Sequence, residues 1–242
     1  MKIIEKIRRK AGDNANEGAV TIAFLGDSVT QGCFEIYLHG DEIGVIFDNE
    51  HAYHNCLCKI LANYYPTVPV NIIKAGISGD SAPHGAMRVE QDVLRFHPDL
   101  VIVCFGLNDA AAGEDGIATY KRALSEIFVK VKETGAELIF MTPNMLNTRI
   151  SPFLAEGLCK EVAEKMCTIQ KDGIMDMYMD AAREVCKTHG VKLCDCYKKW
   201  KNLEKNGVDT TALLSNHINH PTREMSWLFA NSLADIIMEV EE

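Results

Sequence analysis

The chain has 242 residues, of which 47% are hydrophobic and 24% charged, and its formal net charge is -9. This composition predicts a packed globular core and argues against a disordered chain. The negative charge and the pI near 5.4 argue against a broad phosphate-binding surface, so we expect no nucleic-acid partner.

No linker rich in Pro, Ser or Gly divides the chain, and its length suits one large core. We therefore expect a single domain over 1–242, with 1–18 as an N-terminal helical extension. The start lacks a signal-peptide core, and no later run approaches the ~20 apolar residues of a membrane span. The nine cysteines show no repeated CxxC spacing, which favours reduced thiols. These features predict a cytoplasmic protein without a membrane partner.

Short apolar runs rich in β-branched residues predict five strands, the last of them weaker. Their ranges are 20–26, 68–76, 100–106, 137–143 and 191–196. Because these runs are apolar at nearly every position, we expect strands that are buried on both faces.

Stretches with helical spacing lie between or after these strands, at 55–65, 84–96, 116–134, 173–189 and 222–240. Alternating strands and helices predict a parallel sheet with helices on both faces, which is a doubly wound α/β fold. Two irregular stretches, 33–53 and 144–151, follow the first and fourth strands. Both stretches begin at the carboxyl ends of strands, which is the edge at which such sheets bind ligands. We therefore expect these two stretches to determine substrate selectivity.

The first strand ends in Gly26, Asp27 and Ser28. A serine at this position exposes its hydroxyl at the sheet edge, where backbone N–H groups point outward. Ser28 is therefore a candidate nucleophile. It is equally a candidate helix N-cap, since serine is a favoured capping residue.

The second and third strands end in AGISGDS, which contains Gly79, and in FGLND, which contains Asn108. A side-chain amide at a strand end can donate a hydrogen bond to a developing oxyanion, although Asn is also a common turn former. Taken together with Ser28 and a histidine near the C-terminus, these residues form the set that acyl transfer needs.

The motifs GDS, GISGD, GLND and the final HP of His220 and Pro221 occur in the order and spacing of the SGNH hydrolase superfamily, also called GDSL esterases and lipases. The chain resembles this family from Gly26 to Pro221. The resemblance implies a flavodoxin-like, three-layer α/β/α fold with a mostly parallel five-stranded sheet. It also implies ester hydrolysis through an acyl-serine, without a metal or a cofactor.

By matching motif positions, the resemblance assigns Ser28 as the nucleophile and His220 as the general base. It assigns the oxyanion hole to the N–H groups of Ser28 and Gly79 and to the Asn108 side chain. A further position, Arg88, matches a frequent arginine of this family, and we expect it to pair with Asp27 or Asp80.

The final motif departs from the family pattern DxxH, because SNHINHP has His217 where the acid is expected. Three alternatives remain for His220. A backbone carbonyl near Asn216 or His217 could orient the imidazole. An acid from elsewhere could do so, with Asp195 as the first candidate and Asp209 as another. A metal held by the two histidines is the weakest alternative, since a third ligand at a defined place is missing.

We therefore predict a serine esterase that hydrolyses small acyl esters, with acetyl groups on carbohydrates as the leading case and a small-molecule ester as the partner. The missing acid keeps open a catalytically weakened domain that binds an acylated or sugar ligand. A thioesterase or an acyltransferase would use the same residues, and the sequence leaves room for a homo-oligomer.

Overall fold

The computed structural model describes residues 1–40, 42–154 and 156–239. Its main sheet has five strands in the order β4-β1-β5-β6-β7, and all neighbouring strands are parallel. The strands are β1 (Val20–Gly26), β4 (Val70–Gly76), β5 (Leu100–Cys104), β6 (Glu137–Met141) and β7 (Lys192–Cys194). Counted along the main sheet alone, this is the 2-1-3-4-5 order of flavodoxin-like folds. The predicted fold class and all five predicted strands are confirmed.

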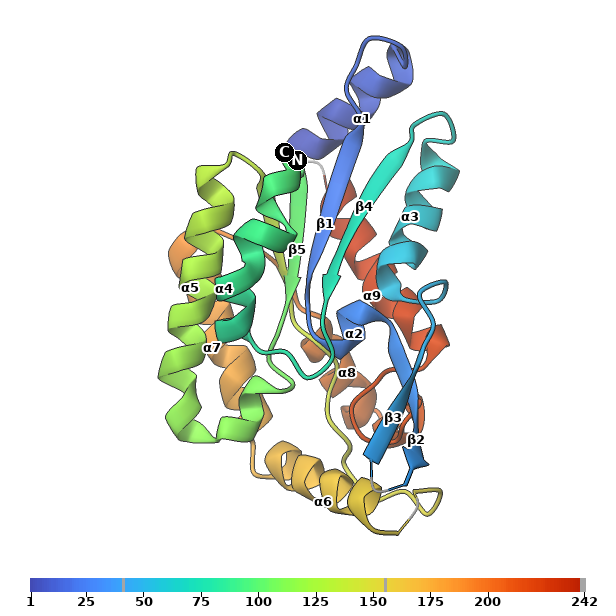
Figure 1. Cartoon of the computed structure of the whole chain (residues 1–242), viewed down its shortest axis with the longest axis vertical. Coiled ribbons are helices and arrows are strands. Elements are labelled where there is room, and N and C mark those ends of the chain that lie inside the picture. The colour runs from blue at the N-terminus through green and yellow to red at the C-terminus, as the bar shows by residue number, and fades with distance from the viewer. Residues whose placement is uncertain (41, 155, 240–242) are drawn as a thin grey trace.

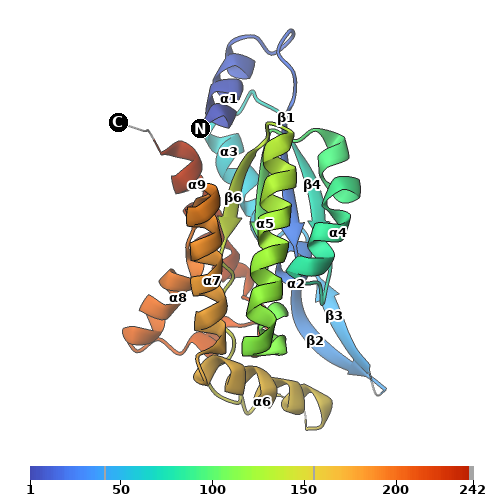
Figure 2. The same ribbon diagram turned by 90° about the vertical axis from the view of Figure 1, so that its left-hand side faces the viewer.

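Helices cover both faces of the sheet, with α4, α5 and α7 on one face and α3 and α9 on the other (Figures 1 and 2). The bounds of the helices are α1 (Lys2–Gly12), α2 (Ser28–Gln31), α3 (Tyr53–Tyr64), α4 (Ala82–Asp92), α5 (Ile117–Glu133), α6 (Leu158–Lys171), α7 (Ile174–His189), α8 (Cys196–Lys205) and α9 (Arg223–Met238). The helices predicted from spacing correspond to α3, α4, α5, α7 and α9. Helices α6 and α8 were not predicted.

The stretch 33–53 is not irregular as expected, because it contains an antiparallel hairpin of β2 (Cys33–His39) and β3 (Glu42–Phe47). This hairpin is a separate two-stranded sheet. It continues beyond the carboxyl ends of the main strands (Figure 1). The stretch 144–151 has neither helix nor strand, in agreement with the prediction.

Between the sheet and α3 lies an aromatic cluster that includes a fully buried histidine. The His54 ring packs against Phe24 and Tyr53, with ring centroids 5.6 and 5.9 Å away. Burial lowers the pKa of His54 to about 4, because a charged imidazole loses its hydration there. His54 is therefore neutral in the folded protein at neutral pH.

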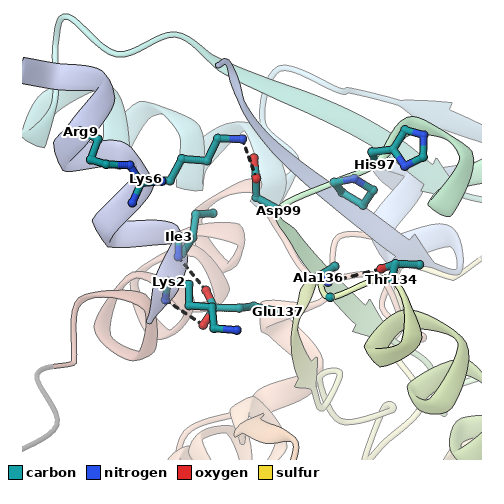
Figure 3. Close-up of a pocket in the computed structure, with 11 residues that line it drawn as sticks. Lys2, Ile3, Lys6, Arg9, His97, Asp99, Thr134, Ala136 and Glu137 are labelled. Carbon is teal, nitrogen blue, oxygen red and sulfur yellow. Dashed lines mark hydrogen bonds and ion pairs between the residues drawn. The ribbon is translucent and has the colours of Figure 1, made fainter. Parts of the chain in front are cut away.

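Helix α1 docks against the amino ends of the strands. The backbone N–H groups of Lys2 and Ile3 donate to the Glu137 carboxylate at 2.9 and 2.7 Å, and Lys6 pairs with Asp99 (Figure 3). A carboxylate at a helix N-terminus satisfies N–H groups that have no partner within the helix. Ile3 also lies in the core, so α1 is packed against the body of the protein. That the chain forms one domain stays a prediction.

A pocket of about 330 Å³ lies beside these α1 contacts. It is at the edge of the sheet opposite the carboxyl ends of the strands, and therefore far from Ser28. Among the described residues, no helix is both long and apolar enough to cross a membrane.

Candidate active site

Ser28 is the first residue of α2, immediately after β1. The residue before it, Asp27, caps the helix by accepting a hydrogen bond from the Val29 N–H at 3.0 Å. The alternative that Ser28 is the cap is therefore wrong, and its hydroxyl is left for another partner. The Ser28 Oγ lies 3.0 Å from the His220 Nε2, and both residues are buried.

The loop that carries Gly79 follows β4 and is held close to α2. A Cβ atom on Gly76 would overlap the backbone of Thr30 and Gln31, so only glycine lets α2 approach the end of β4 so closely. The Gln31 side chain in turn accepts a hydrogen bond from the Ser78 N–H at 2.6 Å. Gly79 itself has a φ of +77°, which favours glycine.

Asn108 follows β5 at the same sheet edge, because Gly26 of β1 pairs with Gly76 of β4 and with Cys104 of β5. Its Nδ2 donates to the Asp80 carbonyl at 2.7 Å. An amide nitrogen carries two hydrogens, so this contact fixes the side chain and leaves the second hydrogen for another acceptor.

A buried ion pair lies behind these donors. The Arg88 Nε donates to the Asp80 carboxylate at 2.8 Å, and the Arg88 guanidinium also reaches the Gly26 carbonyl at 3.0 Å. Of the two partners predicted for Arg88, the structure shows Asp80 and not Asp27. Arg88 thereby ties the end of β1 to the loop that carries Gly79.

Two further carboxyl groups are buried here, and burial raises the pKa of both. The pKa of Asp27 rises to about 7, chiefly by loss of hydration, with Asp109 and Asp80 adding like-charge repulsion. Its Oδ2 has no hydrogen-bond partner among the described residues. The pKa of Asp109 rises to about 6 for the same main reason, although its Oδ1 accepts from the Ala82 N–H.

The opposite side of the His220 ring contacts a backbone carbonyl. The His220 Nδ1 lies 2.9 Å from the Phe34 oxygen in β2. Since a carbonyl can only accept, this contact favours a proton on Nδ1 and leaves a lone pair on Nε2, which faces Ser28. Burial lowers the pKa of His220, while the Phe34 carbonyl and the charge of Glu35 act in the opposite direction.

The backbone of His220 is fixed by its own loop. The Asn216 side chain accepts hydrogen bonds from the N–H groups of Ile218, Asn219 and His220 at 2.9–3.0 Å. The carbonyl of His220 accepts from the Ser215 N–H at 2.8 Å. The imidazole is therefore held both at its backbone and at Nδ1.

Neither candidate acid lies against His220. Asp195 caps α8, and its carboxylate accepts hydrogen bonds from Arg183, Thr142 and the Lys198 N–H. Asp209 pairs with Arg149. The prediction of Asp195 as the orienting acid is contradicted by these contacts. A backbone carbonyl does contact the His220 ring, as one alternative predicted, but it belongs to Phe34 and not to a residue near Asn216 or His217.

His217 does not form a metal site with His220. It has a φ of +56°, and its ring stacks on Phe153 at 5.7 Å between centroids. Both ring nitrogens of His220 already have protein partners. Within the described ranges, no three His, Cys, Asp or Glu side chains are grouped so that they could hold a metal ion.

Comparison with protein-family models finds a match between residues 24–228 and the GDSL-like lipase/acylhydrolase family. The chain belongs to this family. The matched region contains all four motifs and the contact between Ser28 and His220.

Among curated proteins, this GDSL-like chain is similar to an acetylxylan esterase from Geobacillus stearothermophilus, with 26% identity over 132 residues. The alignment covers 50% of the chain and 58% of that relative, which is less than two thirds of its length.

Solved structures show the same fold at low identity. The crystal structure of Axe2, an acetylxylan esterase from Geobacillus stearothermophilus, matches with a TM-score of 0.67 and 19% identity, over 92% of this chain and 96% of that one. The acetyl xylan esterase AlAXEase matches with a TM-score of 0.68 and 20% identity, over 90% and 100%. LAE5, an alpha/beta hydrolase from the metagenome of Lake Arreo, Spain, matches with a TM-score of 0.64 and 23% identity, over 89% and 94%.

The partner of His220 in this GDSL-like protein was missed by sequence reasoning. Phe34 lies 186 positions from His220 and contributes only its backbone oxygen. Every residue type has this oxygen, so no side-chain pattern could have identified it. The same holds for Asp80, whose carbonyl holds Asn108.

Proposed function

We propose that the protein is a serine esterase that removes acetyl or other small acyl groups from carbohydrate esters through an acyl-serine intermediate. The observation that carries this proposal is the 3.0 Å contact between the Ser28 Oγ and the His220 Nε2 in a member of the GDSL-like family. Acetyl groups on a carbohydrate are supported by the names of the relatives, which include acetylxylan esterases.

In the acylation step, the Ser28 Oγ attacks the ester carbonyl carbon while its proton moves to the His220 Nε2. The carbonyl oxygen gains the negative charge. We assign its stabilisation to the Ser28 and Gly79 N–H groups and to the free hydrogen of the Asn108 amide. The tetrahedral intermediate then collapses, and the leaving alcohol takes the proton from His220.

Deacylation repeats these steps with water. His220 accepts a proton from a water molecule, whose oxygen attacks the acyl carbon of the Ser28 ester. The second tetrahedral intermediate releases the carboxylic acid, and the Ser28 oxygen regains its proton from His220. Both half-reactions use the same base and the same N–H donors, so no metal or cofactor is needed.

The proposed orienting group is the Phe34 carbonyl, which takes the place that an acid has in most relatives of the superfamily. A carbonyl dipole fixes the tautomer as a carboxylate does, but it stabilises the imidazolium less because it carries no full charge. This difference agrees with the lowered pKa of His220. We therefore propose a base that keeps its neutral form to a lower pH than an ordinary histidine does.

A pocket of about 290 Å³ adjoins Asn108 and includes Ser81, Pro83 and Thr119 in its lining. It opens beside the proposed oxyanion donor. Its volume is at the lower end of small-molecule sites. Neither Ser28 nor His220 lines it, so it can hold only a part of the substrate next to the reacting ester.

The cytoplasmic location also stays a proposal, and it is supported by nine cysteines that are all free thiols.

The test is hydrolysis of p-nitrophenyl acetate by the wild type and by Ser28→Ala. We expect the variant to lose activity by at least about 10³-fold, because the acyl-serine cannot form. Equal rates for the two proteins would contradict the proposal. A p-nitrophenyl octanoate series and acetate release from acetylated xylo-oligosaccharides then separate small-acyl from long-acyl preference.

A fluorophosphonate probe separates the esterase from a weakened binding domain. We expect it to label Ser28 and to leave Ser28→Ala unlabelled. Failure to label the wild type, together with retained binding of an acetylated xylo-oligosaccharide in calorimetry, would favour the binding domain.

A further inference from the structure

The group that orients His220 lies on a peripheral element. Phe34 belongs to the β2–β3 hairpin, which is not part of the main sheet (Figure 1). The outer half of this hairpin exposes the large apolar side chains Tyr37 and Leu38, and Ile46 near its base is also exposed. A hydrogen bond of 2.9 Å to His220 therefore depends on how the base of the hairpin is held.

The hairpin ladder is interrupted at Phe34. Cys33 pairs with Phe47 and Ile36 pairs with Val45, so two residues of β2, Phe34 and Glu35, lie opposite one residue of β3. This is the arrangement of a β-bulge, which removes a residue from regular pairing and turns its polar groups in a new direction. The bulge leaves the Phe34 carbonyl free for a partner outside the hairpin. Its partner is His220.

One side chain fixes this bulge from outside the hairpin. The Arg223 guanidinium donates through two nitrogens to the two oxygens of Glu35, at 2.5 and 3.1 Å, and its Nε donates to Asp48 at 2.8 Å. It also lies over the Phe34 ring, 4.5 Å from the centroid. Asp48 directly follows β3. Arg223 therefore contacts both strands' ends at the base of the hairpin.

Arg223 also lies next to the loop of the proposed base. It is the first residue of α9, three positions after His220, and Thr222 caps this helix through the Met225 N–H. A planar guanidinium that holds a carboxylate with two bonds restricts both distance and orientation, which a point charge does not. The acceptor and the base are thus fixed relative to each other through one residue.

We propose that Arg223 is a positioning residue that holds the bulged Phe34 carbonyl against the His220 Nδ1, and so supplies the orientation that the missing acid would give. This inference rests on the proposed esterase function. Glu35 and Asp48 are its anchors. Arg223 touches neither Ser28 nor the proposed oxyanion donors, so it acts only through Phe34.

The charged groups around this cluster come from several elements. Glu35 lies on β2, Asp48 and its partner His51 follow β3, and Glu224 follows Arg223 on α9. The Arg223 contact lowers the pKa values of Glu35 and Asp48, so both stay ionised at neutral pH. Because the three side chains are 22–37% exposed, the contact energy is screened by solvent, and the role we propose is geometric.

The variant Arg223→Ala tests this role against the control Arg183→Ala. Arg183 has the same side-chain exposure of 31% and also holds a carboxylate with two bonds, but that carboxylate is Asp195. In Arg223→Ala we expect kcat for p-nitrophenyl acetate to fall by about 10- to 100-fold with KM little changed, since misplacement of a catalytic group by about 1 Å can cost about 10²-fold. Arg183→Ala should keep the wild-type kcat.

The second readout does not depend on activity. Nitrogen-15 NMR of the imidazole distinguishes a ring with one fixed tautomer from a mixture of two. We expect His220 in the wild type and in Arg183→Ala to carry its proton on Nδ1, and in Arg223→Ala to show both tautomers. Arg223→Lys should restore less than half of the lost activity, because an ammonium group cannot bind Glu35 and Asp48 in one plane.

The proposal is overturned if Arg223→Ala is folded by circular dichroism and keeps both the wild-type kcat and the single tautomer. It is also overturned if Arg183→Ala loses as much activity. If the wild type does not hydrolyse esters, the esterase proposal fails, while the NMR comparison still decides the role of Arg223.

Discussion

The oxyanion half of the site, meaning Ser28, Gly79 and Asn108, is backed by three buried carboxyl groups and one buried arginine. In the base half, meaning His220, Phe34 and Arg223, no carboxylate of the described residues is hydrogen-bonded to the imidazole. In the first half, the charges lie behind the donors and fix the backbone, as Arg88 does through Asp80 and the Gly26 carbonyl. In the second half, a neutral carbonyl contacts the ring and the charges lie one residue further out.

This difference shows that a missing acid need not leave the base without a partner. Orientation and charge, which a single aspartate usually provides together, are here separated between the Phe34 carbonyl and Glu35. The oxyanion half instead depends on the buried ion pair of Arg88 with Asp80. Removing Arg88 alone leaves the Asp80 carboxylate buried without its cation. The two halves should therefore respond differently to mutation and to pH.

The largest effect is expected in the oxyanion half, for the stability of Arg88→Ala. This change leaves the fully buried Asp80 carboxylate without its main cation, so we expect a loss of about 3–5 kcal/mol in the free energy of unfolding. Urea unfolding followed by circular dichroism measures it. The exposed pair of Arg149 with Asp209 is the control, and Arg149→Ala should cost about 0–1 kcal/mol. Equal losses would mean that burial of the pair does not matter.

Asn108→Ala breaks the same half without removing a charge. We expect kcat for p-nitrophenyl acetate to fall by about 10²- to 10³-fold, since one oxyanion donor is lost, and KM to change little. Asn108→Asp keeps the size of the side chain but has no N–H to donate, and it should lose at least as much. Activity of either variant within about threefold of the wild type would remove Asn108 from the proposed oxyanion hole.

The pH dependence sharpens the comparison for the base half. The neutral form of His220 is the active one, so kcat/KM should fall as the pH drops through its pKa, which burial places below the ordinary 6.5. The charge of Glu35 raises that pKa, so in Glu35→Gln we expect the acidic limb to move to lower pH. Asp27 and Asp109 titrate nearby, but the replacement of Glu35 leaves both in place. A limb that moves to higher pH would contradict the assignment.

The smallest effect is expected for His217→Asp, which restores the acid of the family pattern. The His220 Nδ1 already has the Phe34 carbonyl as a partner, and residue 217 lies in a left-handed turn with its ring against Phe153. We therefore expect kcat to change by less than about threefold. A gain above about tenfold would show that the loop can turn a carboxylate toward His220, and that Phe34 is a poor substitute.

Much of the fold could be predicted because the buried strands are nearly continuous apolar runs, as at Val20–Gly26, where prediction and structure have the same bounds. The β2–β3 hairpin was taken for a loop, since its residues are mixed in polarity and its exposed half carries no clear alternation. Helix α8 begins inside the stretch 191–196, which was predicted as a strand, because Asp195 caps the helix there.

The candidate site could be predicted only where side chains carry the signal. Ser28 and His220 were named from motifs, and the structure places them in contact. Whether they act as nucleophile and base stays a prediction. Phe34 could not be named, because it contributes only a backbone oxygen, which a bulge leaves unpaired in the hairpin. The bulge is a property of the pairing between β2 and β3, and the hairpin itself was not predicted. Asp195 was named because a carboxylate at a strand end could reach the edge, but helix capping and Arg183 already engage it.

The buried Asp27 and the buried His54 also determine how folding exchanges protons with solvent. The pKa of Asp27 is raised from 3.8 to about 7, so between these values folding takes up a proton, and Asp27 alone makes stability fall as the pH rises. The pKa of His54 is lowered from 6.5 to about 4, so in nearly the same window folding releases a proton, and His54 alone makes stability fall as the pH drops. The two slopes oppose each other. The pair therefore contributes almost no net proton exchange near pH 5.5. Asp109, whose pKa rises to about 6, adds a proton uptake of the same sign as that of Asp27 and is present in both proteins. In urea titrations between pH 4.5 and 6.5, Asp27→Asn should therefore make stability rise more steeply with pH than in the wild type.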